Sequence, residues 1–291
     1  MNRLSTPQRA TILKMLVEGS SLRSISRVTG ASINTVTKLL VDAGRACITY
    51  HDEHVRGVRA KRVQVDEIWE FVYAKARNVE TAKKPPADAG DAWTWTAIDA
   101  DSKLVISWLV GGRDGLAGLE FMTDLADRLA GRVQLTSDGL AVYEGAVEEA
   151  FGADVDYAQL IKVFGDVPRE TTTRYSPGDC RGSFTRTVQG APDPVHIATS
   201  YVERHNLTMR MSMRRFTRLT NAFSKKLQNM VYSLALYFVW YNWCRRHTTT
   251  RMTPAQAAGL TDTWHDAEWI VGLVDAAAPT PRKPGPKTKS N

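Results

Sequence analysis

The chain has 291 residues, of which 43% are hydrophobic, and its formal net charge is +7 at pH 7. This composition excludes a largely disordered chain, and the length allows one large domain and a small one. The pI near 9.3 indicates a polyanionic partner.

The three cysteines, Cys47, Cys180 and Cys244, lie far apart and form no Cys-x-x-Cys pair, so a structural zinc site is not expected. Such usage is typical of a reduced cytoplasmic protein. We expect no signal peptide, because the first seven residues lack an apolar stretch. The apolar run 230–244 is too short to span a bilayer.

Residues 1–50 are expected to form a small all-helical domain. Apolar residues spaced at helical intervals on both sides of Gly30 fit a helix-turn-helix. Its second helix would present Asn34, Thr35 and Lys38 to base edges and phosphates. The alternative is a three-helix cap that binds no ligand. Residues 51–61 contain two histidines without nearby cysteines, which favours a polar linker over a metal site.

Residues 62–260 are expected to form an α/β domain with a mixed five-stranded sheet flanked by helices. Two-residue alternation predicts strands and longer apolar periods predict helices. In chain order these are three strands (62–74, 93–98 and 104–110), a helix (115–130), a strand (132–137), a helix (140–151) and a strand (157–163). We expect a bulge in the first strand near Asp66 and Glu67.

Three further segments complete the predicted organisation. Residues 165–198 are rich in Pro, Gly, Thr and Asp, which predicts an irregular loop that covers the functional site discussed below. The apolar block 221–246 predicts a helix packed behind the sheet. Residues 261–291 are expected to form a C-terminal helix and a flexible basic tail.

Positive charge is concentrated between residues 204 and 261, which contain ten Lys and Arg and no acid. Such a segment is suited to a nucleic-acid backbone, and its contribution should fade with salt. The residues expected to hold phosphates are Arg210, Arg214, Arg215, Arg218, Lys225 and Lys226.

Three carboxylates are candidates for catalysis. Asp66 lies in the first strand, Asp138 ends the fourth, and Glu203 begins a helix. In a mixed sheet of this order the first and fourth strands are neighbours, so these acids can converge. Three such groups suit a pair of Mg²⁺ ions, which could activate an attacking hydroxyl and stabilise the leaving oxygen of a phosphodiester.

Each acid also has a structural explanation. Asp138 before Gly139 could serve a turn and a helix N-cap, and Glu203 could close a capping box with Ser200. Asp66 is harder to explain this way, because Asp is disfavoured in strands. Three other acids compete for the same roles: strand alternation turns Glu67 away from Asp66, and a hairpin turn explains Asp99 and Asp101.

Six segments between residues 60 and 260 carry a resemblance to a known family: VDEIW (65–69), SDG (137–139), YVERHNLTMR (201–210), RRFTRLTNAFSKK (214–226), YNWCRRH (241–247) and RMTPA (251–255). They resemble bacterial insertion-sequence transposases of the DDE class. The resemblance implies an RNase H-like core, an N-terminal region that recognises terminal inverted repeats in double-stranded DNA, activity as a homo-oligomer, and a cytoplasmic location on the nucleoid.

The resemblance also assigns roles to the acids. Asp66 would bridge two Mg²⁺ ions, with Mn²⁺ as a substitute, and Asp138 and Glu203 would each complete one ion. Some relatives carry an N-terminal zinc-binding module, for which this chain lacks the cysteines. Recognition of the element ends would then depend on the helices alone.

The function predicted from the sequence is DNA transposition: hydrolysis at the element end, then attack of the freed 3′ hydroxyl on target DNA. One alternative is a noncatalytic DNA-binding regulator or a decayed copy. Another is an RNase H-like nuclease that cleaves without joining. His205 could approach the scissile phosphate or simply lie on a solvated helix face.

Overall fold

A computed structural model describes residues 4–165, 180–217 and 222–279. Its centre is a mixed sheet with the strand order β3-β2-β1-β4-β5-β6. β1 is antiparallel to β2 and parallel to β4, and β6 is antiparallel to β5. The strands are β1 (Arg62–Val72), β2 (Gly90–Asp99), β3 (Val105–Gly111), β4 (Val133–Ser137), β5 (Val155–Phe164) and β6 (Cys180–Gln189).

The expectation of five strands is wrong, because β6 lies in the region predicted to be an irregular loop. Nine of its ten residues are exposed, so β6 has no buried face and no apolar alternation to reveal it. It pairs with β5 through its backbone, from Tyr157↔Gln189 to Phe164↔Cys180. Of the predicted loop, residues 166–179 lie outside the described ranges.

The expected bulge in the first strand is also absent. Asp66 pairs with Thr96 and Glu67 with Trp95 in an unbroken antiparallel register along β1 and β2. The strand interior holds these acids without distortion because neighbouring side chains donate hydrogen bonds to both carboxylates.

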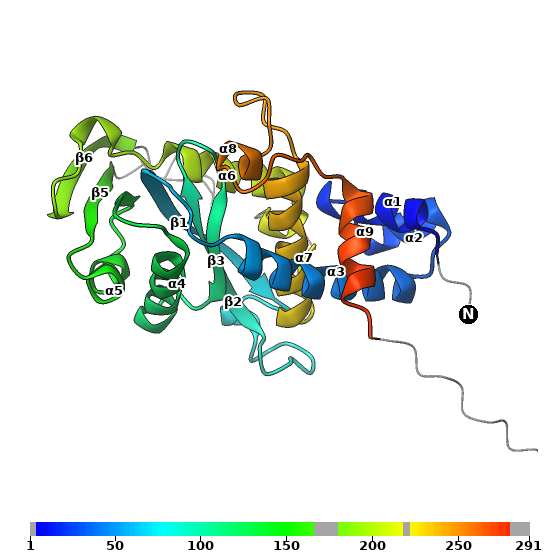
Figure 1. The fold of residues 1–291 in the computed structure, drawn as a ribbon. Helices are drawn as coiled ribbons and strands as arrows, with labels where there is room; N and C mark the ends of the chain where they lie inside the picture. The colour runs from blue at the N-terminus through cyan, green and yellow to red at the C-terminus, as the bar shows by residue number, and fades with distance from the viewer. Residues whose placement is uncertain (1–3, 166–179, 218–221, 280–291) are drawn as a thin grey trace, which may run out of the picture.

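Helices cover both faces of the sheet (Figure 1). On one face lie α4 (Gly115–Arg128) and α5 (Val142–Phe151), which bury Phe121 and Tyr143 against Trp95. On the other lie α6 (Ser200–Ser212) and α7 (Leu227–Val239), whose Met209 and Phe238 share a buried cluster with Ile68 of β1. The block predicted to pack behind the sheet is thereby confirmed as α7 and the π-helical turn Trp240–Cys244 that continues it.

Three N-terminal helices gather at the end of the molecule away from β5 and β6 (Figure 1). They are α1 (Thr6–Val17), α2 (Leu22–Thr29) and α3 (Ile33–His54), and serine side chains cap each N-terminus. Gly30 ends α2 with φ of 70°, a left-handed conformation that glycine adopts without strain.

α3 is longer than the sequence predicted, because its last turn occupies residues 51–54 of the expected polar linker. His51 is buried there, and its Nε2 lies 3.3 Å from the carbonyl oxygen of Val105 in β3. The two histidines of this segment therefore belong to a helix end that packs on the sheet domain.

Two helices follow α7: α8 (Pro254–Ala257) and α9 (Ala267–Ala276). An ion pair between Arg9 and Asp275 fixes α9 on α1, with Nη1 and Oδ1 2.5 Å apart. The buried residues of α1, α3 and α9 belong to the same hydrophobic core as those of β1 and α4. None of the described helices has the length and apolarity needed to cross a membrane.

Candidate metal centre and active-site pocket

Asp66 and Asp138 come together because of where β4 ends. β4 pairs with β1 only from Arg62↔Gln134 to Gln64↔Thr136, and it ends at Ser137. Asp138 is the next residue, level with the part of β1 that carries Asp66. The predicted adjacency of the first and fourth strands is confirmed.

Glu203 enters the same region from the first turn of α6. Gln64 of β1 fixes the start of this helix, since its Oε1 accepts hydrogen bonds from the backbone N–H groups of Tyr201 (2.8 Å) and Val202 (3.1 Å). The capping box considered for Ser200 does not form. The N-cap is Thr199, whose hydroxyl donates to the Glu203 carboxylate at 2.6 Å.

All three predicted acids line one cavity of about 800 Å³. Its walls come from β1, β5, α6, the loop after β3 and the turn after β4. The polar residues that line it are Asp66, Arg113, Asp138, Lys162, Thr199, Glu203, Asn206 and Arg210.

The tightest group of carboxylates in this region is not the predicted triad. One oxygen from each of Asp66, Glu67 and Asp138 lies within 4.8 Å of the other two. Alternation does place Asp66 and Glu67 on opposite faces of β1, as expected, but both can reach Asp138 because β4 has ended beside them. Alternation along β1 therefore does not keep Glu67 away from the other two acids, and the role of each acid stays a prediction.

Glu67 and Asp66 have different electrostatic environments. Glu67 forms an ion pair with Arg113: its Oε1 accepts from Arg113 Nε (2.9 Å) and Nη2 (2.6 Å), and its Oε2 accepts from the Tyr143 hydroxyl (2.9 Å). Neither Asp66 nor Asp138 forms an ion pair with any residue that the structure describes. Burial, followed by the negative charges of Glu67 and Asp138, raises the pKa of Asp66 to about 7.

Hydrogen bonds orient the two aspartates. Asn206 Nδ2 donates to Asp66 Oδ2 at 2.7 Å, and the N–H of Leu140 donates to Asp138 Oδ1 at 2.9 Å. The turn role proposed for Asp138 is therefore real, yet it engages one oxygen only. An N-cap role is not seen, because the N-cap of α5 is Ala141.

Glu203 lines the cavity but is already paired. Its Oε1 accepts from Lys162 of β5 as well as from Thr199. Both partners of the Lys162–Glu203 ion pair are partly exposed, at 37% and 42%. Coordination of a cation by this oxygen would require the pair to open.

Four residues of the site did not stand out in the sequence. Asn206 could have been found, because it follows Glu203 by three positions and so shares its helix face. Arg113, Tyr143 and Lys162 lie in a loop, a helix and a strand whose periodicity gives no signal of a function.

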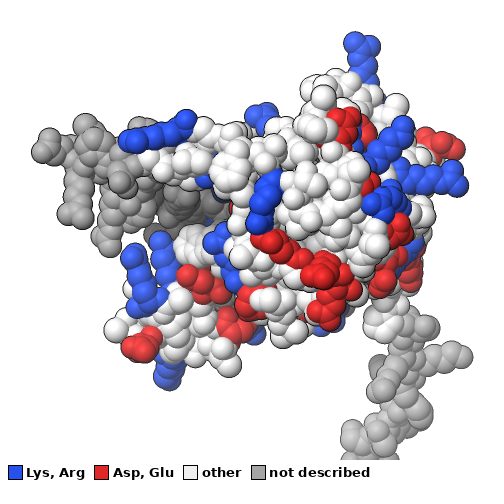
Figure 2. Space-filling view, turned by 90° about the vertical axis from the view of Figure 1, so that its left-hand side faces the viewer, with Lys and Arg blue, Asp and Glu red and all other residues white. Residues whose placement is uncertain are grey.

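The residues expected to bind DNA differ in their placement. Asn34, Thr35 and Lys38 are exposed on α3, as expected, and Lys38 pairs with Asp42. Arg210, Arg214, Lys225 and Lys226 are also exposed, whereas Arg218 lies outside the described residues. On the face shown in Figure 2, Lys and Arg side chains are interspersed with acidic ones instead of forming one patch.

Arg215 is directed into the protein and does not fit a phosphate-binding role. Its two terminal nitrogens donate to Ser224 Oγ (2.6 Å) and Ser233 Oγ (3.0 Å). It also lowers the pKa of Glu70, which burial raises to about 7. Its positive charge therefore stabilises groups inside the protein, namely the two serine hydroxyls and the Glu70 carboxylate.

His205 does not lie on a solvated helix face, so that expectation is wrong, and it is not among the residues that line the cavity of Asp66 and Asp138. Its side chain is buried, and it stacks on Phe238 at 6.0 Å and meets Tyr241 edge-on at 4.6 Å. Burial lowers the pKa of His205 to about 3. The histidine therefore anchors α6 to α7.

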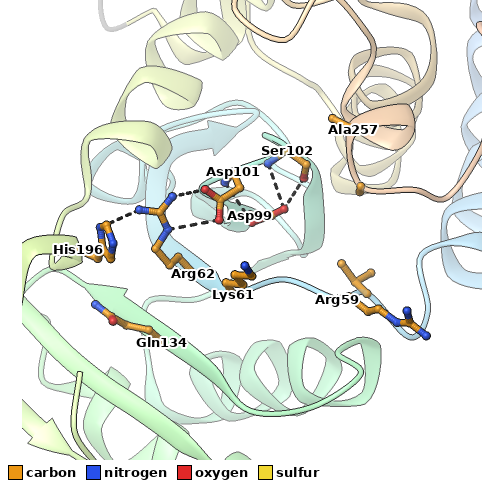
Figure 3. A pocket seen from close by; sticks show the side chains of 11 residues that line it. Arg59, Lys61, Arg62, Asp99, Asp101, Ser102, Gln134, His196 and Ala257 are labelled. Atoms are coloured by element: carbon orange, nitrogen blue, oxygen red, sulfur yellow. Dashed lines mark hydrogen bonds and ion pairs between the residues drawn. The ribbon is translucent and has the colours of Figure 1, made fainter. Parts of the chain in front are cut away.

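A second cavity of about 710 Å³ lies beside the start of β1 and is lined by Lys61 and Arg62 (Figure 3). Both of its aspartates are already bonded: Asp101 pairs with Arg62, which also bonds His196, and Asp99 accepts from Ser102. The hairpin-turn explanation of Asp99 and Asp101 is confirmed by these contacts. This cavity holds no cluster of uncompensated carboxylates.

No family model matches the sequence, and no curated protein matches it significantly. Among solved structures, the chain is similar to the piggyBac transposase synaptic complex with hairpin DNA. The identity is 10%, the TM-score is 0.38, and the match covers 95% of this chain and 73% of that one. It is also similar to the Mos1 mariner paired-end complex with Mn, with 9% identity, a TM-score of 0.29, and coverage of 81% and 76%. These values do not establish a shared function.

Proposed function

We propose that the chain is a DDE-class DNA transposase whose catalytic residues are Asp66, Asp138 and Glu203. The observation that carries this proposal is the meeting of the three acids at one cavity, two of them without a cationic partner among the described residues. The sheet order, with β2 antiparallel and β4 and β5 parallel to the central strand, fits the RNase H-like core expected from the sequence.

The donor set fits a divalent cation. Asp66 and Asp138 offer hard carboxylate oxygens that form no ion pair with any described residue, and Mg²⁺ and Mn²⁺ prefer such ligands. Glu203 would join them after releasing Lys162. When bound, two such ions supply charge stabilisation to the attacking and leaving oxygens of an in-line displacement.

The chain's own residues would position the DNA for two successive reactions. In the first, water attacks the phosphorus at the element end, the P–O3′ bond breaks, and the 3′ oxygen leaves as a hydroxyl. In the second, that hydroxyl attacks a target phosphodiester, and the target's own 3′ oxygen leaves. Exposed Arg210, Arg214, Lys225 and Lys226 would attract the backbone around the cavity.

The N-terminal helices would recognise the terminal inverted repeats, with Asn34, Thr35 and Lys38 on the second helix of a helix-turn-helix formed by α2 and α3. The left-handed Gly30 between these helices fits the turn of such a motif. We expect a homo-oligomer to hold two element ends. The division at residues 50 and 62 between this region and the catalytic domain remains a prediction.

The proposal can be tested with a plasmid that carries the coding sequence and its flanking DNA on both sides. The purified chain should cut and join this DNA only with Mg²⁺ or Mn²⁺. Asp66→Asn should abolish both reactions, whereas the matched control Asp154→Asn, an exposed acid outside the cavity, should leave them unchanged. Equal activity in Asp66→Asn would refute the proposal, and cutting without joining would identify a nuclease.

A further inference from the structure

Arg113, a cation that lines the cavity of Asp66 and Asp138, is held in a fixed position and has N–H donors that no described residue uses. Arg113 lies in the loop between β3 and α4, and its side chain is 40% exposed. The carboxylate of Glu67 beneath it is only 2% exposed, and a single oxygen of that carboxylate accepts from both Nε and Nη2 of Arg113. A buried acid thus fixes the position of a partly exposed guanidinium.

Two further contacts limit the movement of this arginine. Its guanidinium lies over the ring of Trp93, with Cζ 4.6 Å from the ring centroid. The loop itself is anchored on both sides of Arg113: Trp95 Nε1 donates to the carbonyl of Gly112 at 2.9 Å, and Asp114 caps α4. The guanidinium is therefore pre-organised before any ligand arrives.

The hydrogen-bonding capacity of Arg113 is only partly used. A guanidinium has five N–H donors, and Arg113 uses two of them on Glu67. Nη1 donates to no residue within the described ranges, and Arg113 lines the same cavity as Asp66 and Asp138. Neutralising Glu67 alone does not require an arginine that opens onto this cavity.

A planar guanidinium edge of this kind suits a phosphate oxygen. We propose that Arg113 binds the reacting phosphate and that its open edge holds a non-bridging oxygen of the phosphodiester beside Asp66 and Asp138. This inference rests on the proposed function and names the group that positions the reacting phosphate. Glu67 is then the positioning residue that holds Arg113, and not a metal ligand.

The test compares full-length variants in two measurements. The first is the Mn²⁺ affinity without DNA, obtained from the electron paramagnetic resonance signal of free Mn²⁺. The second is the rate at which the variant nicks the plasmid described above at saturating Mn²⁺ and DNA. Arg113→Gln should lower the rate about 100-fold, as expected for loss of one donor to a reacting oxyanion. Its Mn²⁺ affinity should not fall, and the DNA concentration for half-maximal rate should change little, because other cations hold the DNA.

Two other variants give the inference its specificity. Arg113→Lys keeps the charge but not the fork, so it should recover part of the rate. Arg132→Gln removes an arginine that is also paired, with Asp156, but lies outside the cavity, and it should have no effect. Glu67→Gln should lower the rate less than Arg113→Gln and leave the Mn²⁺ affinity intact.

The opposing outcomes are distinct. If Arg113→Gln nicks DNA at the wild-type rate while Mn²⁺ binding is intact, the assignment of Arg113 is wrong and the metal centre stands. If Glu67→Gln weakens Mn²⁺ binding tenfold or more, Glu67 is a metal ligand and the positioning role is overturned. If the wild-type chain neither binds Mn²⁺ nor nicks DNA, both the inference and the proposed function fail.

Discussion

His51 provides a test of how the N-terminal helices are joined to the sheet domain. Its imidazole is 3% exposed and lies between Trp108 of β3 and Trp243. Burial and the positive charge of Arg128 lower the pKa of His51 to about 4, although Val105, Asp124 and Asp52 act in the opposite direction. In the folded protein the ring is therefore neutral at pH 5.

The magnitude of the effect follows from linkage. An unfolded histidine has a pKa of about 6.5, so as the pH falls the unfolded chain takes up a proton before the folded one does. Stability is lost as the pH falls from about 7 toward 4, and no more is lost below that. Between pH 7 and pH 5 this single site should lower the free energy of unfolding by about 2 kcal/mol.

The assay is urea unfolding of the wild type and His51→Gln at pH 7 and pH 5. Glutamine does not titrate and can still donate to the Val105 carbonyl, so the variant should lose about 2 kcal/mol less than the wild type over this interval. Cys47→Ala removes another buried side chain of α3 and should lower stability equally at both pH values. If His51→Gln and the wild type lose the same free energy, His51 is not buried against β3.

Three further predictions concern the site and the packing around it. Lys162→Met should strengthen Mn²⁺ binding by up to about fivefold. It removes the partly exposed ion pair, worth about 0.2–1 kcal/mol, through which Lys162 competes with the metal for Glu203. Weaker binding in a calorimetric titration would contradict this. Gly44→Ala should lower the free energy of unfolding in urea by about 3 kcal/mol, since a Cβ at residue 44 would lie 2.6 Å from the Cα of Tyr232. An unchanged unfolding midpoint would show that α3 and α7 are not in such close contact. Mn²⁺ at 100 times its dissociation constant should stabilise the wild type by about 2.7 kcal/mol but not Asp66→Asn, as measured by thermal unfolding.

The elements that bury an apolar face could be predicted from the sequence, because burial imposes a period on the chain. The hairpin of β2 and β3, the helices α4 and α5, and α7 behind the sheet all follow this pattern. β6 could not be predicted, since nine of its ten residues are exposed and its backbone pairing with β5 leaves no apolar period in the sequence.

Side-chain direction was less predictable than element type, because it depends on tertiary neighbours. Arg215 belongs to a basic run and looks like a surface residue, but the buried Glu70 and two serines draw its guanidinium inward. His205 and His51 look polar in the sequence, yet aromatic rings on other elements enclose them. The periodicity of a single segment does not indicate which residues of other elements will contact its side chains.

The location of the proposed metal centre follows from which charges are compensated, not from the number of acids. Four carboxylates lie in or beside the cavity, and two cations are committed to two of them: Arg113 to Glu67 and Lys162 to Glu203. The remaining pair, Asp66 and Asp138, has no cationic partner among the described residues. Because buried like charges repel at close range, this pair is where a divalent cation gains most. The two committed cations differ in that only Lys162 must release its acid before the site can be completed.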